Sequence, residues 1–412
     1  MGNRIFVADK ETLDATHANT KALLAEIGDS DYFKPKRYGY KVNKNDSNPK
    51  TRIAYIYDAV DFLPASMNYA TGTFDFGSWG DLWFIKDNFP CMLKFDGTVD
   101  YKLNPNDYSL REDGTASDVA NTAYQGNAMS AMPTVWYSQY EIGNYEYHVF
   151  CEEQYDETYH AYCHQRADGS IMKYRYFPMF EGYSDGTRLR SLSGLTVTAN
   201  QNGATELQRA TANGELWSTI TWNMVNLMKG LLTLISKSDD AQTAFGNGNC
   251  QSEEYLTTGQ LNDKGQFYGY STQTQAVKVF HCENWWGNYW IRLRGYICDR
   301  GKVKVKMTPP YNNDGSGYID TGVRWVGNTG GYVKNTLNSH FGRIPCLVGG
   351  SSSTYLCDYA WWNDAIVGYA IFGGRRESGL FCGALSVVLT NTFTYANTYI
   401  AASLSCEEPL QA

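Results

Sequence analysis

Residues 357–406 read CDYAWWNDAIVGYAIFGGRRESGLFCGALSVVLTNTFTYANTYIAASLSC, and this stretch carries the strongest pattern in the chain. It contains no Lys, Met, Gln, His or Pro, although all five residue types occur upstream. Small, hydroxylated and aromatic residues take their place. Tyr, Ser, Gly and Asn allow a surface to present contact area at a low cost in conformational entropy. The composition therefore predicts a recognition surface rather than a catalytic centre.

Within this stretch, apolar residues alternate as they do in a half-buried strand. Leu385, Val387 and Leu389 occupy every second position, so we expect them to face the core. Trp361, Trp362, Gly373 and Gly374 are expected to belong to the same fixed scaffold. The remaining positions are expected to face solvent as adjustable ligand-binding residues: Tyr359, Asn363, Asp364, Val367, Tyr369, Arg375, Arg376, Glu377, Phe381, Ser386, Val388, Thr390, Thr392, Thr394, Tyr395 and Tyr399. Arg and Tyr are typical interface anchors.

Upstream, short aromatic runs separated by Gly, Asn and Asp predict strands, for example at 53–57, 82–85 and 145–150. The aromatic segment 279–290 predicts a pair of strands around a Gly-Asn turn. One clear helix is expected over 219–237, where apolar residues form a broad stripe and Thr219 or Thr221 is positioned as N-cap. The sequence therefore predicts an α+β protein that is rich in strands and has few helices.

The N-terminal part differs in character from the rest. Residues 10–27 predict an amphipathic helix, which docks on a partner, self-associates or packs on its own domain. Residues 41–52 are polar and rich in turn formers, so a boundary is expected near residue 50. We therefore expect an attachment or oligomerisation segment over 1–50 and a single domain over 51–412.

Charge and composition exclude several classes of partner. The chain has 35 basic and 43 acidic residues, a formal charge of −8 and no long basic run, which argues against nucleic acid and anionic membranes. The longest apolar run, at 230–235, is too short to span a bilayer, and no export signal is evident. Synthesis in the cytoplasm is therefore expected. The ten cysteines show no CxxC spacing, so free buried thiols are expected, with paired disulfides as the alternative.

No motif in the sequence supports catalysis or a cofactor. His281 and Glu283 form an H-x-E on one face of an expected strand, but the P-C-x-x-C that completes a deaminase zinc site is absent. The stretch NNDGSG (312–317) is similar to half of a calcium loop and lacks its closing Glu. No G-x-S-x-G elbow is present. We therefore expect no catalytic residues, no metal site and no cofactor.

Two late segments resemble a known fold family. WGNYW (286–290) resembles the G-N-x-W core strand of the C-type lectin fold of the formylglycine-generating-enzyme type. FGG (372–374) and IAASL (400–404) resemble the late strands of that fold. Over about 50–412 the chain most resembles the variable proteins of bacteriophage diversity-generating retroelements, of the major tropism determinant type. DYKLNPNDY (100–108) and KGQFYGY (264–270) are similar to stretches of phage tail-tip proteins.

This resemblance implies a mechanism of variation. In the family, a retroelement randomises the adenines of a template, so Asn codons change to many residues but never to Lys, Met, Gln, Trp or Glu. The absence of Lys, Met and Gln after Cys357 agrees with this pattern, whereas Glu377 departs from it.

The resemblance implies a receptor-binding protein at the phage tail tip, hence located in the virion. Its diversified surface would bind a host bacterial surface protein or glycan, and other phage tail proteins would hold it. A homotrimer is implied as well. Two alternatives stay open: a formylglycine-generating-type oxidase, for which Cys382 and Cys406 are the late cysteines, and a fixed structural tail protein without host contact.

Overall fold

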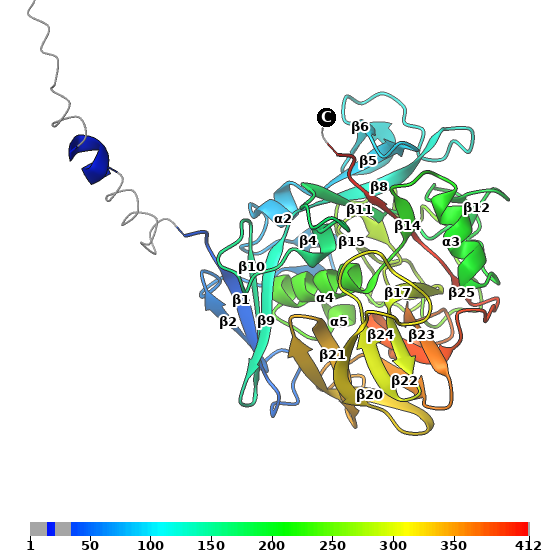
Figure 1. Ribbon diagram of the computed structural model, residues 1–412. Helices are drawn as coiled ribbons and strands as arrows, with labels where there is room; N and C mark the ends of the chain where they lie inside the picture. The colour runs from blue at the N-terminus through cyan, green and yellow to red at the C-terminus, as the bar shows by residue number, and fades with distance from the viewer. Residues whose placement is uncertain (1–14, 21–33, 411–412) are drawn as a thin grey trace, which may run out of the picture.

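The apolar helix expected over 219–237 forms the centre of the molecule. The computed structural model describes residues 15–20 and 34–410 (Figure 1). Helix α4 (Trp222–Ser236) is buried along its whole length and lies in the middle of the strands. Its apolar stripe packs in the core, and polar residues on its other side, such as Asn223, Asn226 and Lys229, are also buried and make hydrogen bonds to neighbouring segments. Thr221 is its N-cap residue, although its side chain makes no capping hydrogen bond.

A four-stranded antiparallel sheet covers one side of the core. Its strands in order are β2 (Ile53–Tyr57), β1 (Tyr38–Asn43), β10 (Tyr145–Cys151) and β9 (Trp136–Ile142). Tyr40 and Val42 on β1 point into the core. Because β1 pairs with both β2 and β10, the boundary expected near residue 50 does not divide the fold.

The N-terminal helix expected over 10–27 falls only partly on described residues. Residues 15–20 are helical and exposed. The remainder of that expectation lies outside the described residues.

The second sheet has nine strands and carries most of residues 357–406. Its order is β19 (Ile319–Arg324), β18 (Lys302–Val305), β17 (Trp290–Asp299), β23 (Val367–Gly373), β24 (Gly383–Asn391), β22 (Tyr359–Asn363), β20 (Asn328–Ser339) and β21 (Gly342–Val348), with β25 (Ile400–Ala401) on β17. The end strands β19 and β21 come into contact, so the sheet curls into a nearly closed barrel. Strands β22 and β24 are parallel neighbours.

The third sheet holds the last strand of the described chain. Its order is β14 (Trp217–Thr219), β26 (Leu404–Glu407), β11 (Tyr174–Pro178), β8 (Gly126–Pro133), β5 (Phe89–Lys94), β6 (Val99–Asn104) and β7 (Asp107–Arg111). Strand β26 lies inside this sheet, paired on one side with β14 and on the other with β11. The C-terminal segment therefore crosses from the second sheet to the third.

Short elements complete the molecule. Six short strands form hairpins: β3 (Ser66–Asn68) with β4 (Thr73–Asp75), β12 (Tyr183–Ser184) with β13 (Leu189–Arg190), and β15 (Lys278–Val279) with β16 (Cys282–Glu283). Within residues 34–410 the helices other than α4 are α2 (Trp83–Lys86), α3 (Gly203–Thr211), α5 (Ala241–Phe245) and the single 3₁₀ turns η1 (Tyr162–His164) and η2 (Gly379–Phe381). The described chain is thus rich in strands and has few helices, as the sequence predicts.

Two local expectations are wrong. The segment 82–85 is not a strand, because Trp83, Phe84 and Ile85 are buried in succession on the short helix α2. The 279–290 segment does not turn into a hairpin at Gly287 and Asn288. The hairpin of β15 and β16 turns earlier, and His281 sits in that turn with a positive φ, so His281 and Glu283 do not share a strand face.

A buried ion-pair network joins the first two sheets around the end of α4. Arg343 on β21 pairs with Glu146 on β10 at 2.7 Å and with Asp239 at 2.5 Å. Arg52 lies 3.4 Å from Asp239. Buried ions are tolerated only when paired, so these charges fix how the sheets meet.

The ten cysteines are all free, and all but the partly exposed Cys346 are buried, as expected. Among the helices within residues 15–20 and 34–410, none combines the length and apolarity that crossing a bilayer requires.

Candidate ligand-binding site

A pocket opens on the second sheet, between β22, β24 and the turn that follows β23. Its cavity volume is about 370 Å³. The residues that line it are Trp290, Tyr359, Trp361, Ile371, Arg375, Glu377, Ser378, Phe381, Val388, Thr390, Asn391 and Tyr399. Tyr359, Arg375, Glu377, Phe381, Val388, Thr390 and Tyr399 are among the positions marked from the sequence. Folding therefore brings these positions to one place.

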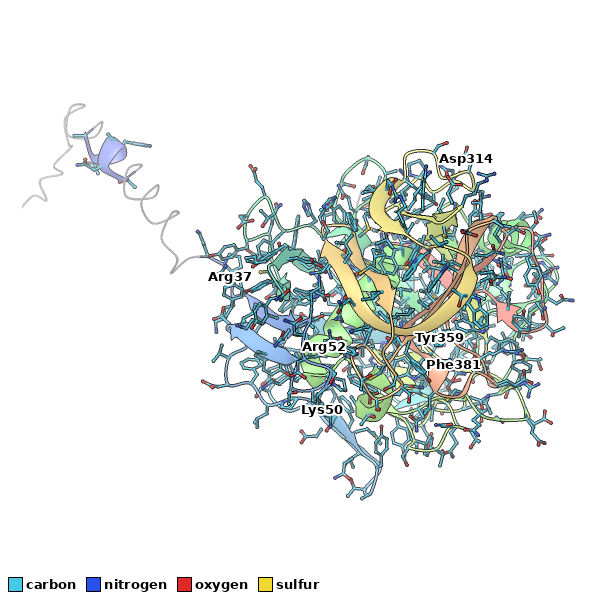
Figure 2. The ribbon with its side chains drawn as sticks, turned by 90° about the horizontal axis from the view of Figure 1, so that it is seen from below. Arg37, Lys50, Arg52, Asp314, Tyr359 and Phe381 are labelled. Carbon is cyan, nitrogen blue, oxygen red and sulfur yellow. The ribbon has the colours of Figure 1, made fainter. Side chains whose placement is uncertain are left out.

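Aromatic rings form one wall of the pocket. The ring centroids of Tyr359 and Phe381 lie 4.4 Å apart, and Figure 2 shows the two side chains next to each other. Tyr332 on β20 stands edge-on to both rings. Trp361 extends the wall and is 41% exposed, and Phe381 is 42% exposed. Exposed aromatic side chains of this kind supply large contact area with few rotatable bonds.

Charged and hydroxyl groups form the opposite wall. The guanidinium of Arg375 lies 4.3 Å from the ring centroid of Tyr399 and pairs with Glu377 at 3.0 Å. Burial raises the pKa of Tyr399 to about 12, so this hydroxyl stays protonated at neutral pH. The hydroxyls of Tyr399 and Tyr395 lie 3.3 Å apart, which places Tyr395 at the rim. The pocket thus combines apolar faces with hydrogen-bonding groups.

Ser386 positions the aromatic wall from behind. Its hydroxyl donates to the carbonyl of Phe381 at 2.6 Å and accepts from the backbone N–H of Tyr359 at 3.1 Å. Ser386 is fully buried. The expectation that it faces solvent is wrong, because the 3₁₀ turn η2 packs over this part of β24.

Tyr369 is the second position that does not face solvent. It is buried on β23 and its ring packs against Phe393, with centroids 5.1 Å apart. The loop that follows β24 covers it, and alternation along β23 gives no sign of that loop. Tyr369 therefore belongs to the core and not to a binding surface.

Several other marked positions lie away from the pocket. Asn363, Asp364 and Val367 sit at the turn between β22 and β23, where Asn363 Oδ1 accepts from the N–H of Ala365 at 2.9 Å and Asp364 Oδ2 from that of Gly327 at 2.7 Å. Thr392 and Thr394 are exposed on the loop after β24.

Arg376 follows Arg375 directly and does not itself line the pocket, although it pairs with the lining residue Glu377 at 2.9 Å. Its guanidinium lies 4.4 Å from the ring centroid of Tyr255 and donates to the carbonyls of Ser252 and Glu253. This side chain holds the turn against the 250–255 loop.

Sequence reasoning missed Trp290, Trp361, Ile371, Ser378 and Asn391, which also line the pocket. Trp361 was expected in the core. It shares a strand face with Tyr359, two residues earlier, whereas Trp362 points inward and stacks on Trp325 at 3.8 Å. The same alternation that marks β24 would have found it on β22.

The WGNYW motif (286–290) reaches the pocket through Trp290, and its Asn288 has a structural role. Asn288 is fully buried; its amide donates to Glu181 at 2.6 Å, and its oxygen accepts from Asn249 and from the N–H of Leu256. Burial raises the pKa of Glu181 to about 8. Through these hydrogen bonds Asn288 links the segments that contain Glu181, Asn249 and Leu256.

The arrangement offers no activated nucleophile or metal centre. Burial raises the pKa of Cys382 well above its usual value, which is the opposite of what a reactive thiolate needs. Cys406 lies on β26 in another sheet, so the two late cysteines do not form a pair. Within the described residues, no cluster of three or more His, Cys, Asp or Glu side chains is placed to hold a metal ion.

Comparison with protein-family models and with curated proteins returns no match to this sequence. The functional argument therefore depends on the pocket and on the sequence pattern of the residues that line it.

Proposed function

We propose that this protein is a bacteriophage receptor-binding protein, in which a C-type lectin fold of the formylglycine-generating-enzyme type presents a diversified surface to the host. The ligand is a protein or glycan on the bacterial surface. One observation carries the proposal: seven of the sixteen positions marked from the sequence, scattered over 359–399, line one exposed aromatic pocket.

The chemistry of the pocket suits recognition. Exposed Trp, Tyr and Phe faces and a stacked Arg are the side chains that contribute most to binding energy at protein interfaces. The strands beneath are fixed by buried residues such as Leu385, Val387 and Leu389. A rigid scaffold with exchangeable side chains can change its ligand without losing its fold. Assembly as a homotrimer would add avidity to a weak single site.

Binding to bacteria tests the proposal directly. Labelled protein is mixed with a panel of bacterial strains, and bound fluorescence is measured by flow cytometry. Tyr395→Ala is expected to lower binding to the recognised strain at least tenfold. The matched control is Tyr145→Ala on the first sheet, because both tyrosines are 37% exposed. Equal binding by both variants would contradict the proposed surface.

Natural variation provides a second test that needs no host. Genomes of sibling phages are expected to differ mainly at the codons of the pocket residues, and a near-copy of the segment is expected beside a reverse transcriptase gene. Differences spread evenly over the gene would instead favour a fixed structural tail protein.

A further inference from the structure

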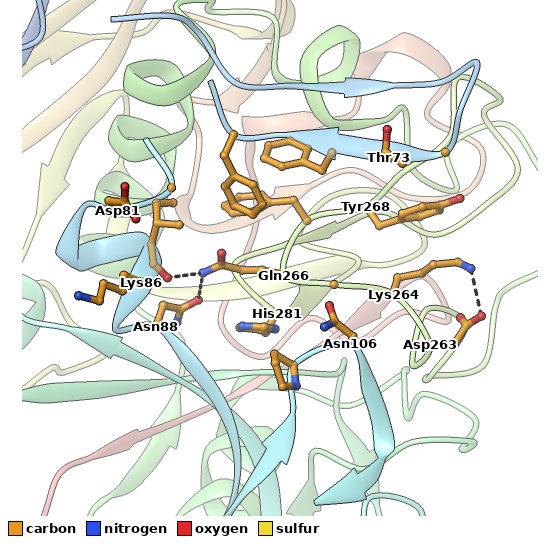
Figure 3. A pocket seen from close by; sticks show the side chains of 18 residues that line it. Thr73, Asp81, Lys86, Asn88, Asn106, Asp263, Lys264, Gln266, Tyr268 and His281 are labelled. Carbon is orange, nitrogen blue, oxygen red and sulfur yellow. Dashed lines mark hydrogen bonds and ion pairs between the residues drawn. The ribbon is translucent and has the colours of Figure 1, made fainter. Parts of the chain in front are cut away.

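A second cavity lies on a different part of the molecule and is not used by the proposed function. Its volume is about 790 Å³, against about 370 Å³ for the first pocket. The β3–β4 hairpin, the end of α2, the turn after β6 and the 263–268 segment surround it (Figure 3). None of its lining residues belongs to 357–406, so it stands apart from the diversified segment.

Two side-chain amides, the half-buried Gln266 and the buried Asn88, line this cavity in a fixed orientation. Gln266 Nε2 donates to the carbonyl of Ile85 at 3.0 Å and to Asn88 Oδ1 at 2.8 Å. Asn88 is in turn fixed by its donation to Ser130 and Ala131. Both N–H groups of the Gln266 amide are therefore used, while among the described residues none donates to its oxygen. That oxygen is left as an acceptor for a ligand.

Aromatic side chains also line the cavity. Phe74 stacks on Phe267 with centroids 4.6 Å apart and meets Phe76 edge-on at 5.0 Å. Tyr268 stands at the rim beside Gly72. Such ring faces carry partial negative charge and attract weakly positive C–H groups.

The charges around the cavity balance. Asp81 and Lys86 lie toward one end, and Asp263 and Lys264 pair with each other at 3.0 Å toward the other end. Burial lowers the pKa of His281 well below its usual value, so this lining residue is neutral. The lining therefore carries no net formal charge, which favours an uncharged ligand over an anion or a cation.

We propose that this cavity binds an uncharged saccharide. Sugar rings have apolar C–H faces that pack on aromatic rings and hydroxyls that both donate and accept, which fits a cavity lined by a fixed amide and by aromatic side chains. The volume lies within the range of small-molecule sites. This inference stands independently of the receptor-binding proposal, because it uses none of the same residues.

The test is titration of the full chain with methyl glycosides of glucose, galactose, mannose and N-acetylglucosamine and with maltotriose. Saturation-transfer NMR detects contact and calorimetry measures affinity. For a ligand of about a dozen heavy atoms, a dissociation constant of about 1 mM is expected.

Two variants identify the cavity as the site. Gly80→Leu fills it: a Cβ at Gly80 meets only Phe76, at an ordinary 3.5 Å, and the residue's φ is not in the left-handed region. Tyr268→Ala removes rim aromatic surface, and Tyr145→Ala on the first sheet, outside the lining, is its control. We expect at least tenfold weaker binding for the first two and unchanged binding for Tyr145→Ala. No saturation transfer to any of the sugars, or binding that survives in both Gly80→Leu and Tyr268→Ala, would overturn the proposal.

Discussion

The guanidinium of Arg375 lies over the ring of Tyr399, 4.3 Å from its centroid, and this contact closes one side of the candidate site. Arg375 follows β23 and Tyr399 precedes β25, so the contact joins the two turns that flank β24. A stacked, planar guanidinium keeps its donors in a fixed plane and is less strongly hydrated than an ammonium. The hydrogen-bond donors of Arg375 are therefore already oriented when a ligand enters the pocket.

Replacing Arg375 is expected to weaken ligand binding and to leave the stability of the fold nearly unchanged. Arg375→Ala is expected to reduce binding to the recognised bacterial strain at least tenfold and to lower the Tm by no more than about 2 °C, as is usual for surface substitutions. Arg376→Ala is the adjacent comparison: it loses two hydrogen bonds to backbone carbonyls and the ion pair with Glu377, and it is expected to lower the Tm more. The reverse order of Tm values, measured by calorimetry, would contradict these assignments.

The adjacent tryptophans of β22 provide a matched pair for the two faces of the sheet. Trp362 is 4% exposed and stacks on Trp325, so Trp362→Ala is expected to cost about 3–5 kcal/mol in the free energy of unfolding. Trp361→Ala leaves the core intact and is expected to cost far less. Urea denaturation measures both, and similar losses for the two variants would show that Trp361 is also part of the core.

Ser386 links stability to the shape of the site. Ser386→Ala removes the hydroxyl that bonds to Phe381 and Tyr359 and is expected to cost about 1–3 kcal/mol. Because both ring positions depend on it, ligand binding is expected to fall too, although Ser386 itself does not face solvent. Thr390→Ala, which removes a hydroxyl from the same strand at the pocket, is the comparison, and its unfolding free energy should change less.

The buried ion network makes a prediction about stability alone. Arg343→Met leaves Glu146 and Asp239 without their main partner and is expected to destabilise the protein by about 3–5 kcal/mol. Arg324 forms an exposed pair with Asp320 at 2.8 Å, so Arg324→Met should change little. Equal thermal stability of the two variants would show that the Arg343 network contributes no more than a surface pair.

Glu181 gives the protein a defined pH dependence. Burial raises its folded-state pKa to about 8 from an ordinary 4.5, so the folded state holds the proton more tightly than the unfolded state. Its contribution to stability is fully present below about pH 4.5 and is lost as the pH rises to about 8, with a slope of up to about 1.4 kcal/mol per pH unit. Glu181→Gln should remove this decline. Parallel stability curves for variant and wild type from pH 5 to 9 would contradict the assignment.

Regular patterns in the sequence predicted the parts of the fold that depend on local periodicity. The stripe over 219–237 becomes α4, and the alternation at Leu385, Val387 and Leu389 becomes the buried face of β24. Tyr369 and Ser386 could not be placed in this way. They are buried by Phe393 and by the turn η2, which reach them through tertiary packing that no strand pattern encodes.

Because β26 lies inside the third sheet, that sheet can form only when translation continues past the candidate site. This strand follows every residue of the candidate site in the sequence, yet it lies between β14 and β11 inside another sheet. A stop codon or frameshift anywhere in 359–399 would therefore leave two strands without their common neighbour. Mutations that truncate the product would therefore prevent the third sheet from forming, whereas mutations that only exchange side chains of the pocket would leave that sheet intact.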